Sequence, residues 1–353
     1  MSQIPTADLL SIFKCAARIR VVEQFIAKVY PQQQMRCPTH LCIGQEAVPA
    51  VFGHLAQKED VFVGTYRSHG HYLAKGGDLV LMFAELLGSS KGCSGGMGGS
   101  MHLIDTQRNF MGTSAIVAGG VPIAAGAALS LKRQQQPYVA IAFTGDAALE
   151  EGIYYETVNF ACLHKLPVIF VSENNQLAIS TPLALRQAKT DLFNRFEALG
   201  LKGIFVREND IEGLFQAATF AFEHASTSQE PILIEYSLSR MSVHVGHDIR
   251  GPIDGWWQDP LAKTTDPCAV KALARILIER QVLTHEQIKQ LHEELVREVE
   301  QAYQKAQDEM SHSTKLLKDY VYASGLTSTL PKQSSSSRTE FNAVEPSKLI
   351  NPF

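Results

Sequence analysis

The chain has 353 residues and a formal net charge of −4, with 45% hydrophobic and 19% charged residues. This composition is typical of a globular protein with a large core and excludes a disordered chain. The small negative net charge provides no general basic field, so we expect no nucleic-acid partner. Six cysteines occur without a C-x-x-C pair, which favours free thiols in a reducing compartment over disulfides.

Two segments in the first half of the chain bear on targeting and membranes. Apolar residues recur at helical spacing over residues 7–30, and the charges between them argue against a signal peptide. We expect a cytoplasmic protein, or one of the mitochondrial matrix if this is a mature eukaryotic chain.

Residues 110–131 carry no charge and are long enough to span a bilayer, but they are rich in alanine and glycine. We predict a loop and a helix in a tightly packed core, where glycines such as Gly120 and Gly126 let another backbone come close, and no membrane contact.

A glycine-rich segment, GCSGGMGGSMH at 92–102, resembles a phosphate-binding loop at first sight. Before it, the pattern predicts a helix from near Gln45, a short buried strand within 60–70 and a helix over 78–88. A dinucleotide-binding fingerprint must follow a strand and open a helix. Because this segment follows a helix and its glycines have another spacing, we predict a tight, irregular loop of the kind that often lines a site.

The middle of the chain predicts a parallel sheet. Short continuous apolar runs at 138–143 and 166–171 are typical of strands buried on both faces, and a helical pattern over 148–163 lies between them. This connection makes the two strands parallel and the crossover right-handed. A third run at 231–236 follows a helical stretch at 211–225. The predicted fold is therefore α/β, with a doubly wound, mostly parallel sheet.

The C-terminal part predicts a helical extension and a tail. Asp266 and Pro267 have the pattern of an N-cap with proline at the first helical position, and Thr284 with Gln287 forms a capping box. After about residue 327 the chain becomes rich in serine. We expect one domain over 1–326, with its C-terminal helices from about 260, and a mobile tail over 327–353.

Polar side chains follow both strands of the central unit. Asp146 comes after the first strand, and Asn175 after the second. Because the carboxyl ends of parallel strands meet at one edge of a sheet, we expect these two side chains to lie close together. A carboxylate and a carboxamide suit Mg²⁺, completed by phosphate oxygens. An aspartate here could instead cap the next helix, and Glu150 and Glu151 are interpreted as first-turn helix residues.

The spacing of these residues matches the thiamine diphosphate-binding motif, in which Gly-Asp-Gly is followed about thirty residues later by Asn-Asn. Residues 10 to about 310 resemble the alpha subunit of the decarboxylating component of 2-oxo acid dehydrogenase complexes, a group that includes the pyruvate, branched-chain and acetoin dehydrogenases. The matching segments, in order, are HLCIGQEA, YRSHG, GGMGGSMH, SAIVAGGVPIAAGAAL, GDAALEEG, SENNQLAISTP and SRMSVHVGH.

The resemblance implies the thiamine diphosphate-binding fold, with thiamine diphosphate and Mg²⁺ as cofactors. Its metal ligands would be Asp146, Asn175 and the backbone carbonyl of Leu177. Tyr66 and Arg67 would face the diphosphate, since an arginine fork pairs well with phosphate oxygens. Further cofactor contacts would come from Gly145, Ala147 and Ala148, and from the backbone at Ala115 and Val117, which would hold the aminopyrimidine.

The resemblance also implies two active-site histidines. One is His40, and the other lies in the loop at 240–248. Counting forward from Arg240 favours His244, whereas a gapped alignment selects His247. A histidine in this loop would move protons or contact the diphosphate, although a surface histidine without a role is the alternative.

Several positions depart from the family pattern. Ala147 and Ala115 stand where the family usually has glycine, so Ala147 would be costly if its backbone needs a positive φ. Glu173 is typical of the pyruvate type, whereas the following AISTP is typical of the branched-chain type. Neither His244 nor His247 is followed by the serine that kinases phosphorylate in some relatives.

The family's cofactor-activating glutamate belongs to a separate beta chain. The resemblance therefore implies an α2β2 assembly that decarboxylates a 2-oxo acid and passes the acyl group to a lipoyl-bearing acyltransferase, with 110–131 at a subunit contact. One alternative is a subunit of an acetoin-type enzyme that cleaves hydroxyketones or performs carboligation. A non-catalytic regulatory subunit is another.

Overall fold

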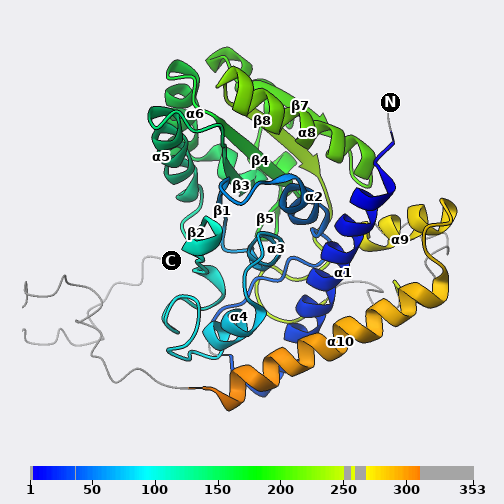
Figure 1. Ribbon diagram of the computed structural model, residues 1–353. Helices are drawn as coiled ribbons and strands as arrows, with labels where there is room; N and C mark the ends of the chain where they lie inside the picture. Colours follow the sequence, from blue (N-terminus) through cyan, green and yellow to red (C-terminus); the bar gives the residue numbers. More distant parts are fainter. Residues whose placement is uncertain (1–2, 36, 250–255, 259–267, 311–353) are drawn as a thin grey trace, which may run out of the picture. The chain divides into compact units, whose positions relative to one another are not determined.

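Among the residues that the structure describes, six parallel strands form the central sheet of the protein. The computed structural model describes residues 3–35, 37–249, 256–258 and 268–310. The strand order is β2-β1-β3-β4-β8-β7 (Figure 1). A separate antiparallel hairpin joins β5 and β6. The strands are β1 Val61–Val63, β2 Phe110–Gly112, β3 Ala140–Gly145, β4 Val168–Asn174, β5 Leu177–Ala178, β6 Thr181–Pro182, β7 Lys202–Val206 and β8 Ile232–Ser237.

Helices cover both faces of this sheet, as the predicted doubly wound fold requires (Figure 1). Along β3, Ile141 and Phe143 join a core that contains α1, α2 and α8, whereas Ala140 and Ala142 join a core that contains α5 and α6. Successive side chains of a strand point to opposite faces, so burial on both faces produces the continuous apolar runs seen in the sequence. The predicted fold class is confirmed.

The predicted helices agree with observed ones to within a few residues, whereas the short helices His69–Ala74 and Leu183–Arg186 were not predicted. The predicted helix over 7–30 is α1, and that over 211–225 is α8. The helices are α1 Thr6–Val29, α2 Ala47–Leu55, α3 His69–Ala74, α4 Leu79–Leu86, α5 Gly120–Arg133, α6 Gly152–Leu163, α7 Leu183–Arg186, α8 Ile211–Ser228, α9 Ala269–Glu279 and α10 His285–Asp308. Short 3₁₀ helices cover Tyr30–Gln32, Gly99–Met101, Thr106–Arg108, Asp146–Glu150, Phe193–Arg195 and Glu197–Leu199.

The helix after β3 begins later than predicted. A 3₁₀ helix occupies Asp146–Glu150, and α6 starts only at Gly152. Glu151 is the N-cap residue of α6, and its side chain makes no capping hydrogen bond. The interpretation of Glu150 and Glu151 as first-turn residues of the helix is therefore wrong, since both precede it. Glu150 instead accepts a hydrogen bond from Arg186.

The uncharged segment 110–131 forms β2, a loop and α5. Only one face of α5 is buried, so the prediction that the segment lies within a packed core is half right. A Cβ at Gly120 would lie 2.9 Å from a Val63 methyl, which confirms a close approach there, but one at Gly126 would meet nothing within 4 Å. Among the described residues, no helix is long and apolar enough to cross a membrane.

The glycine-rich segment closes around a carboxylate of its own chain. Glu85, at the end of α4, is buried and accepts hydrogen bonds of 2.7–2.9 Å from the backbone N–H groups of Ser94, Gly96, Gly98 and Gly99. A ring of N–H groups of this kind binds anions. Here the anion is internal, so the prediction of a tight structural loop is confirmed.

The C-terminal helices pack on α1 and α4. The capping box of Thr284 and Gln287 opens α10, with both of its hydrogen bonds present, and is confirmed. The predicted cap at Asp266 and Pro267 and the predicted tail over 327–353 lie outside the described residues.

Candidate functional site

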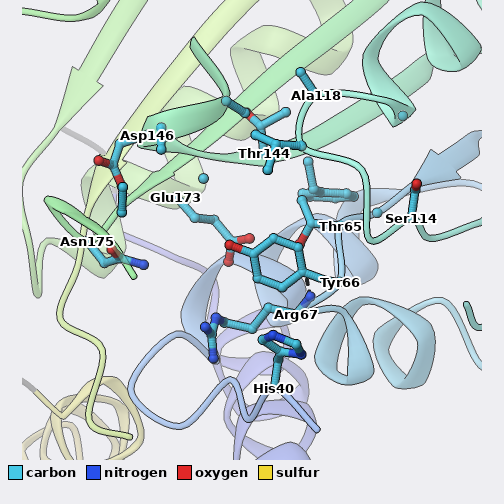
Figure 2. A pocket seen from close by; sticks show the side chains of 18 of the residues that line it. His40, Thr65, Tyr66, Arg67, Ser114, Ala118, Thr144, Asp146, Glu173 and Asn175 are labelled. Carbon is cyan, nitrogen blue, oxygen red and sulfur yellow. Dashed lines mark hydrogen bonds between the residues drawn. The ribbon is translucent and has the colours of Figure 1, made fainter. Parts of the chain in front are cut away.

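A cavity of about 420 Å³ opens at the carboxyl edge of the sheet, where ligands bind in folds of this kind. It is lined by the segments that follow β1, β3 and β4, by the start of α5 and by the 240–244 loop. Figure 2 shows Asp146 and Asn175 on one side of it. Tyr66, Arg67 and His40 lie on the other. Nearly all of the predicted site residues line this cavity: His40, Tyr66, Arg67, Ala115, Val117, Gly145, Asp146, Ala147, Ala148, Asn175, Leu177 and His244.

Asp146 lies at the end of β3 and is almost completely buried. It is the N-cap of neither following helix, since Gly145 precedes the 3₁₀ helix and Glu151 precedes α6. Its carboxylate instead accepts a hydrogen bond of 2.5 Å from the guanidinium of Arg186. Burial raises the pKa of Asp146, and the hydrogen bond and charge of Arg186 partly offset this rise. Asp146 is thus a buried carboxylate that already bonds to a cation.

Asn175 emerges beside Asp146 because β3 and β4 pair in register, with Gly145 opposite Glu173. The Asn175 amide donates to Oε1 of Gln45 at 3.0 Å, and its carbonyl oxygen accepts the backbone N–H of Leu177 at 3.0 Å. These two bonds fix which way the carboxamide faces. Gln45 belongs to the quoted HLCIGQEA segment, but its contact with Asn175 joins residues 130 positions apart and was not predicted.

The oxygen donors at this edge fit a divalent cation of the Mg²⁺ type. The donor set is a carboxylate and a carboxamide oxygen, which are hard ligands. Among the described residues, no group of three His, Cys, Asp or Glu side chains could hold a metal ion. A cation at Asp146 would therefore need amide, carbonyl and ligand oxygens to complete its coordination. Arg186 shows that the Asp146 carboxylate accepts a positive charge.

The opposite wall is cationic. Arg67 is buried, and its two terminal nitrogens donate to the backbone carbonyls of Leu41 at 2.6 Å and His244 at 2.9 Å. Burial lowers the pKa of Arg67, yet a guanidinium remains charged over the physiological range. The two carbonyls hold the guanidinium plane in place. One wall of the cavity has a carboxylate that could bind a divalent cation, and the other has an arginine that could pair with a phosphate. This arrangement suits a phosphorylated ligand whose phosphate oxygens also bind the cation.

Two histidine rings cluster with Tyr66. The His40 ring centre lies 4.6 Å from that of Tyr66 and 5.1 Å from that of His244. Burial and the charge of Arg67 lower the pKa of His40 to about 3 and that of His244 to about 4. Both imidazoles are therefore neutral near pH 7, and each could accept or donate a proton. Nδ1 of His40 is buried without a hydrogen-bond partner among the described residues.

His247 lies elsewhere. It does not line this cavity. Its ring tilts against Tyr30, its Nε2 lies 3.7 Å from the Asp248 carboxylate, and 43% of its side chain is exposed. The geometry favours His244 over His247 as the loop histidine of the site.

Comparison with known proteins identifies the family. A family model described as the dehydrogenase E1 component matches residues 14–315. The pyruvate dehydrogenase E1 component subunit alpha of Porphyra purpurea is 33% identical over 324 residues, which are 89% of this chain and 93% of the relative. That of Rickettsia bellii (strain RML369-C) is 30% identical over 292 residues, 83% and 88% of the two chains. The alpha subunit of acetoin:2,6-dichlorophenolindophenol oxidoreductase of Bacillus subtilis (strain 168) is 36% identical over 240 residues, 68% and 72% of the two chains.

The chain belongs to the dehydrogenase E1 component family. The resemblance predicted from the motifs is confirmed, because the match covers the whole stretch that carries them.

The departures from the family pattern have little structural cost. Neither Ala147 nor Ala115 has a positive φ, so no backbone strain arises at these alanines. Strain is present instead at Ile179, which lines the cavity with a φ of 54°. That conformation is unfavourable for a β-branched residue.

We expect Ala147→Gly to leave cofactor affinity unchanged and to lower the free energy of unfolding by about 0.5–1 kcal/mol, because glycine gains backbone entropy in the unfolded chain. Calorimetric titration and urea unfolding would measure the two quantities. A clear gain in affinity would show that the alanine obstructs the site.

The sequence analysis assigned no site role to Glu173 or Arg240, which both line the cavity. From the sequence, Glu173 indicates only the substrate type. Its buried carboxylate lies 3.3 Å from Nε2 of His71, and one of its oxygens has no hydrogen-bond partner among the described residues. Arg240 also lines the cavity and donates to the carbonyl of Ile179 at 2.8 Å. Glu173 is the penultimate residue of β4 and Arg240 follows β8, so both lie at the same sheet edge, which is the signal that could have found them.

The low pKa of His40 predicts a pH dependence of stability. The unfolded chain protonates this histidine near pH 6.5, whereas the folded protein resists protonation down to about pH 3. The unfolded state therefore binds more protons, and stability falls as the pH drops below 6.5. We expect the loss of unfolding free energy between about pH 7 and 5 to be smaller in His40→Gln than in the wild type. Urea unfolding at both pH values tests this, with the exposed His164→Gln as control. Equal losses in all three proteins would contradict it.

Proposed function

We propose that the chain is the alpha subunit of a thiamine diphosphate- and Mg²⁺-dependent 2-oxo acid dehydrogenase. It would decarboxylate a 2-oxo acid together with a beta subunit and pass the acyl group to a lipoyl-bearing acyltransferase. One observation carries the proposal. Asp146 and Asn175, at the ends of adjacent strands, face Arg67 across a single cavity in a chain of the dehydrogenase E1 component family.

Each wall of the cavity has a role in this proposal. Asp146, Asn175 and the carbonyl of Leu177 would hold Mg²⁺, while Tyr66 and Arg67 would contact the diphosphate. The backbone at Ala115 and Val117, with the turn over 145–148, would hold the rest of the cofactor. When bound, thiamine diphosphate supplies a nucleophilic carbon and an electron sink for the charge left by departing carbon dioxide.

The histidines would manage protons. His40 and His244 are neutral and their ring centres lie 5.1 Å apart, so either could donate to, or accept from, a group bound in the cavity. Because Arg67 holds the His244 backbone carbonyl, the same guanidinium that would contact the diphosphate also sets the position of this histidine. His247 would have no part in the reaction.

A subunit contact is supported by apolar side chains on α5 and α6. These helices pack on each other and on one face of the sheet. Their outer surfaces expose Ile123, Ile153, Phe160 and Leu163, with Leu163 74% exposed. Several large apolar side chains on neighbouring helices mark an interaction surface. A beta subunit there would complete an α2β2 assembly and the cofactor site.

A second candidate shares the cofactor and differs in the substrate. The Bacillus subtilis relative is named for acetoin, so cleavage of a hydroxyketone is the alternative that a specific similarity favours. The cavity walls of this chain do not include the part that a beta subunit would add. Substrate choice between pyruvate, a branched 2-oxo acid and acetoin therefore needs the assembled enzyme.

The test is an assay of the chain with its cognate beta subunit, thiamine diphosphate and Mg²⁺. A panel of 2-oxo acids and acetoin would be supplied with a dye as electron acceptor, with and without a lipoyl domain. The proposal predicts turnover of a 2-oxo acid and acylation of the lipoyl domain. Turnover of acetoin alone would support the second candidate. Assembly with the beta subunit but neither cofactor binding nor turnover would indicate a non-catalytic regulatory subunit.

A further inference from the structure

The guanidinium of Arg186 is shared between two carboxylates at the edge of the cavity. One terminal nitrogen lies 2.5 Å from Oδ2 of Asp146, and the other bonds to Oε1 of Glu150. Its Nε donates to the carbonyl of Thr181 at 3.2 Å. The side chains of Asp146 and Arg186 are 1% and 10% exposed, so this ion pair is largely shielded from water.

The chain itself delivers the guanidinium to this position. The hairpin of β5 and β6 follows Asn175 directly, and the one-turn helix α7, which ends at Arg186, follows the hairpin. Thr181, which accepts from Nε of Arg186, belongs to β6 of that hairpin. The segment that carries Asn175 and Leu177 therefore also returns a cation onto Asp146.

A buried carboxylate needs a compensating charge, and Arg186 supplies one to Asp146. A divalent cation on the same carboxylate would lie within a few ångströms of the guanidinium, where two positive charges repel strongly. The two cations would therefore compete for the charge of Asp146. Glu150 gives the guanidinium a second carboxylate to which it can stay bonded when it leaves.

We propose that Arg186 is a built-in counter-ion that competes with the divalent cation for Asp146 and withdraws onto Glu150 when the cation binds. This inference rests on the proposed function, because it requires Asp146 to be a metal ligand. As a consequence, the protein binds the metal ion more weakly than it would with the same oxygen ligands and no Arg186. The reason is that the metal ion binds only to those molecules in which Arg186 has withdrawn from Asp146.

Removing the competing charge should therefore strengthen metal binding. In Arg186→Gln we expect Mn²⁺, used as a probe for Mg²⁺, to bind about tenfold more tightly in the presence of thiamine diphosphate. Without metal, the same variant should have a lower melting temperature than the wild type, because Asp146 loses its partner. In Glu150→Gln the guanidinium has no second carboxylate, so Mn²⁺ should bind more weakly than in the wild type.

The experiment uses the full chain assembled with its beta subunit, Mn²⁺ titrations followed by calorimetry, and melting curves with and without metal. Arg195→Gln, which removes an arginine later in the same segment, is the matched control. Equal or weaker Mn²⁺ binding in Arg186→Gln, with binding intact in the wild type, would overturn the competition while leaving the proposed function standing. If the wild type binds no Mn²⁺, both proposals fail. They also fail if the Asp146→Asn variant binds Mn²⁺ as tightly as the wild type does.

Discussion

Turnover by the assembled enzyme should fall by about 100-fold or more in Asp146→Asn. The change keeps the shape of the side chain and removes the only carboxylate in the proposed set of metal ligands. Mg²⁺ binds through one or two carboxylates and substrate phosphates, so an amide at this position holds it poorly. Steady-state rates at several Mg²⁺ concentrations would show a rise in the Mg²⁺ requirement as well as a lower maximal rate.

The control for this substitution is Asp308→Asn, at the exposed end of α10. Within the described part of the chain, the Asp308 side chain accepts a hydrogen bond only from Gln304. The control substitution should leave turnover unchanged. Because the amide introduced by Asp146→Asn cannot form a full ion pair with Arg186, the folded state of the variant is checked by circular dichroism. A folded Asp146→Asn enzyme with wild-type rate and wild-type Mg²⁺ dependence would rule out Asp146 as a metal ligand.

The largest effect on stability is expected at Glu85. In Glu85→Ala, four backbone N–H groups of the glycine-rich loop lose the carboxylate that accepts them. Hydrogen bonds to a charged group contribute about 1.5–3 kcal/mol each, so a loss of more than about 4 kcal/mol is expected even if water replaces some of them. That is a large part of the stability of a typical protein, and the variant should be largely unfolded at 37 °C.

Thermal melting and urea unfolding measure this loss. Glu85→Gln retains one acceptor oxygen and should fall between the wild type and Glu85→Ala. The exposed Glu59→Ala is the matched control and should change the free energy of unfolding by less than about 0.5 kcal/mol. A Glu85→Ala protein within about 1 kcal/mol of the wild type would mean that the loop does not depend on this carboxylate.

The local patterns of the sequence were enough to predict four of the six strands, β1, β3, β4 and β8, and the placement of Asp146 and Asn175, whereas β2 and β7 were not predicted. Continuous apolar runs report burial on both faces of a strand, and parallel pairing brings strand ends to one edge. The apposition of Asp146 and Asn175 follows from the register of β3 and β4. Neither feature depends on the details of side-chain packing.

Other features depend on contacts between distant residues, which a periodic pattern does not encode. The four N–H bonds to Glu85 arise because the loop folds back over the end of α4. Gln45, which precedes α2, meets Asn175, which follows β4, and the hairpin and α7 bring Arg186 to Asp146. The start of α6 was misplaced because the 3₁₀ helix at 146–150 has a composition that is equally compatible with an α-helix.

The central claim is that this chain supplies the metal and diphosphate half of a thiamine diphosphate site. Titration calorimetry of the chain with its beta subunit tests it most directly, with thiamine diphosphate added in the presence of Mg²⁺ and in the presence of a chelator. The account predicts tight binding with Mg²⁺ and at least about a tenfold loss of affinity with the chelator or in Asp146→Asn. No binding, or binding that is indifferent to both Mg²⁺ and Asp146, would contradict it.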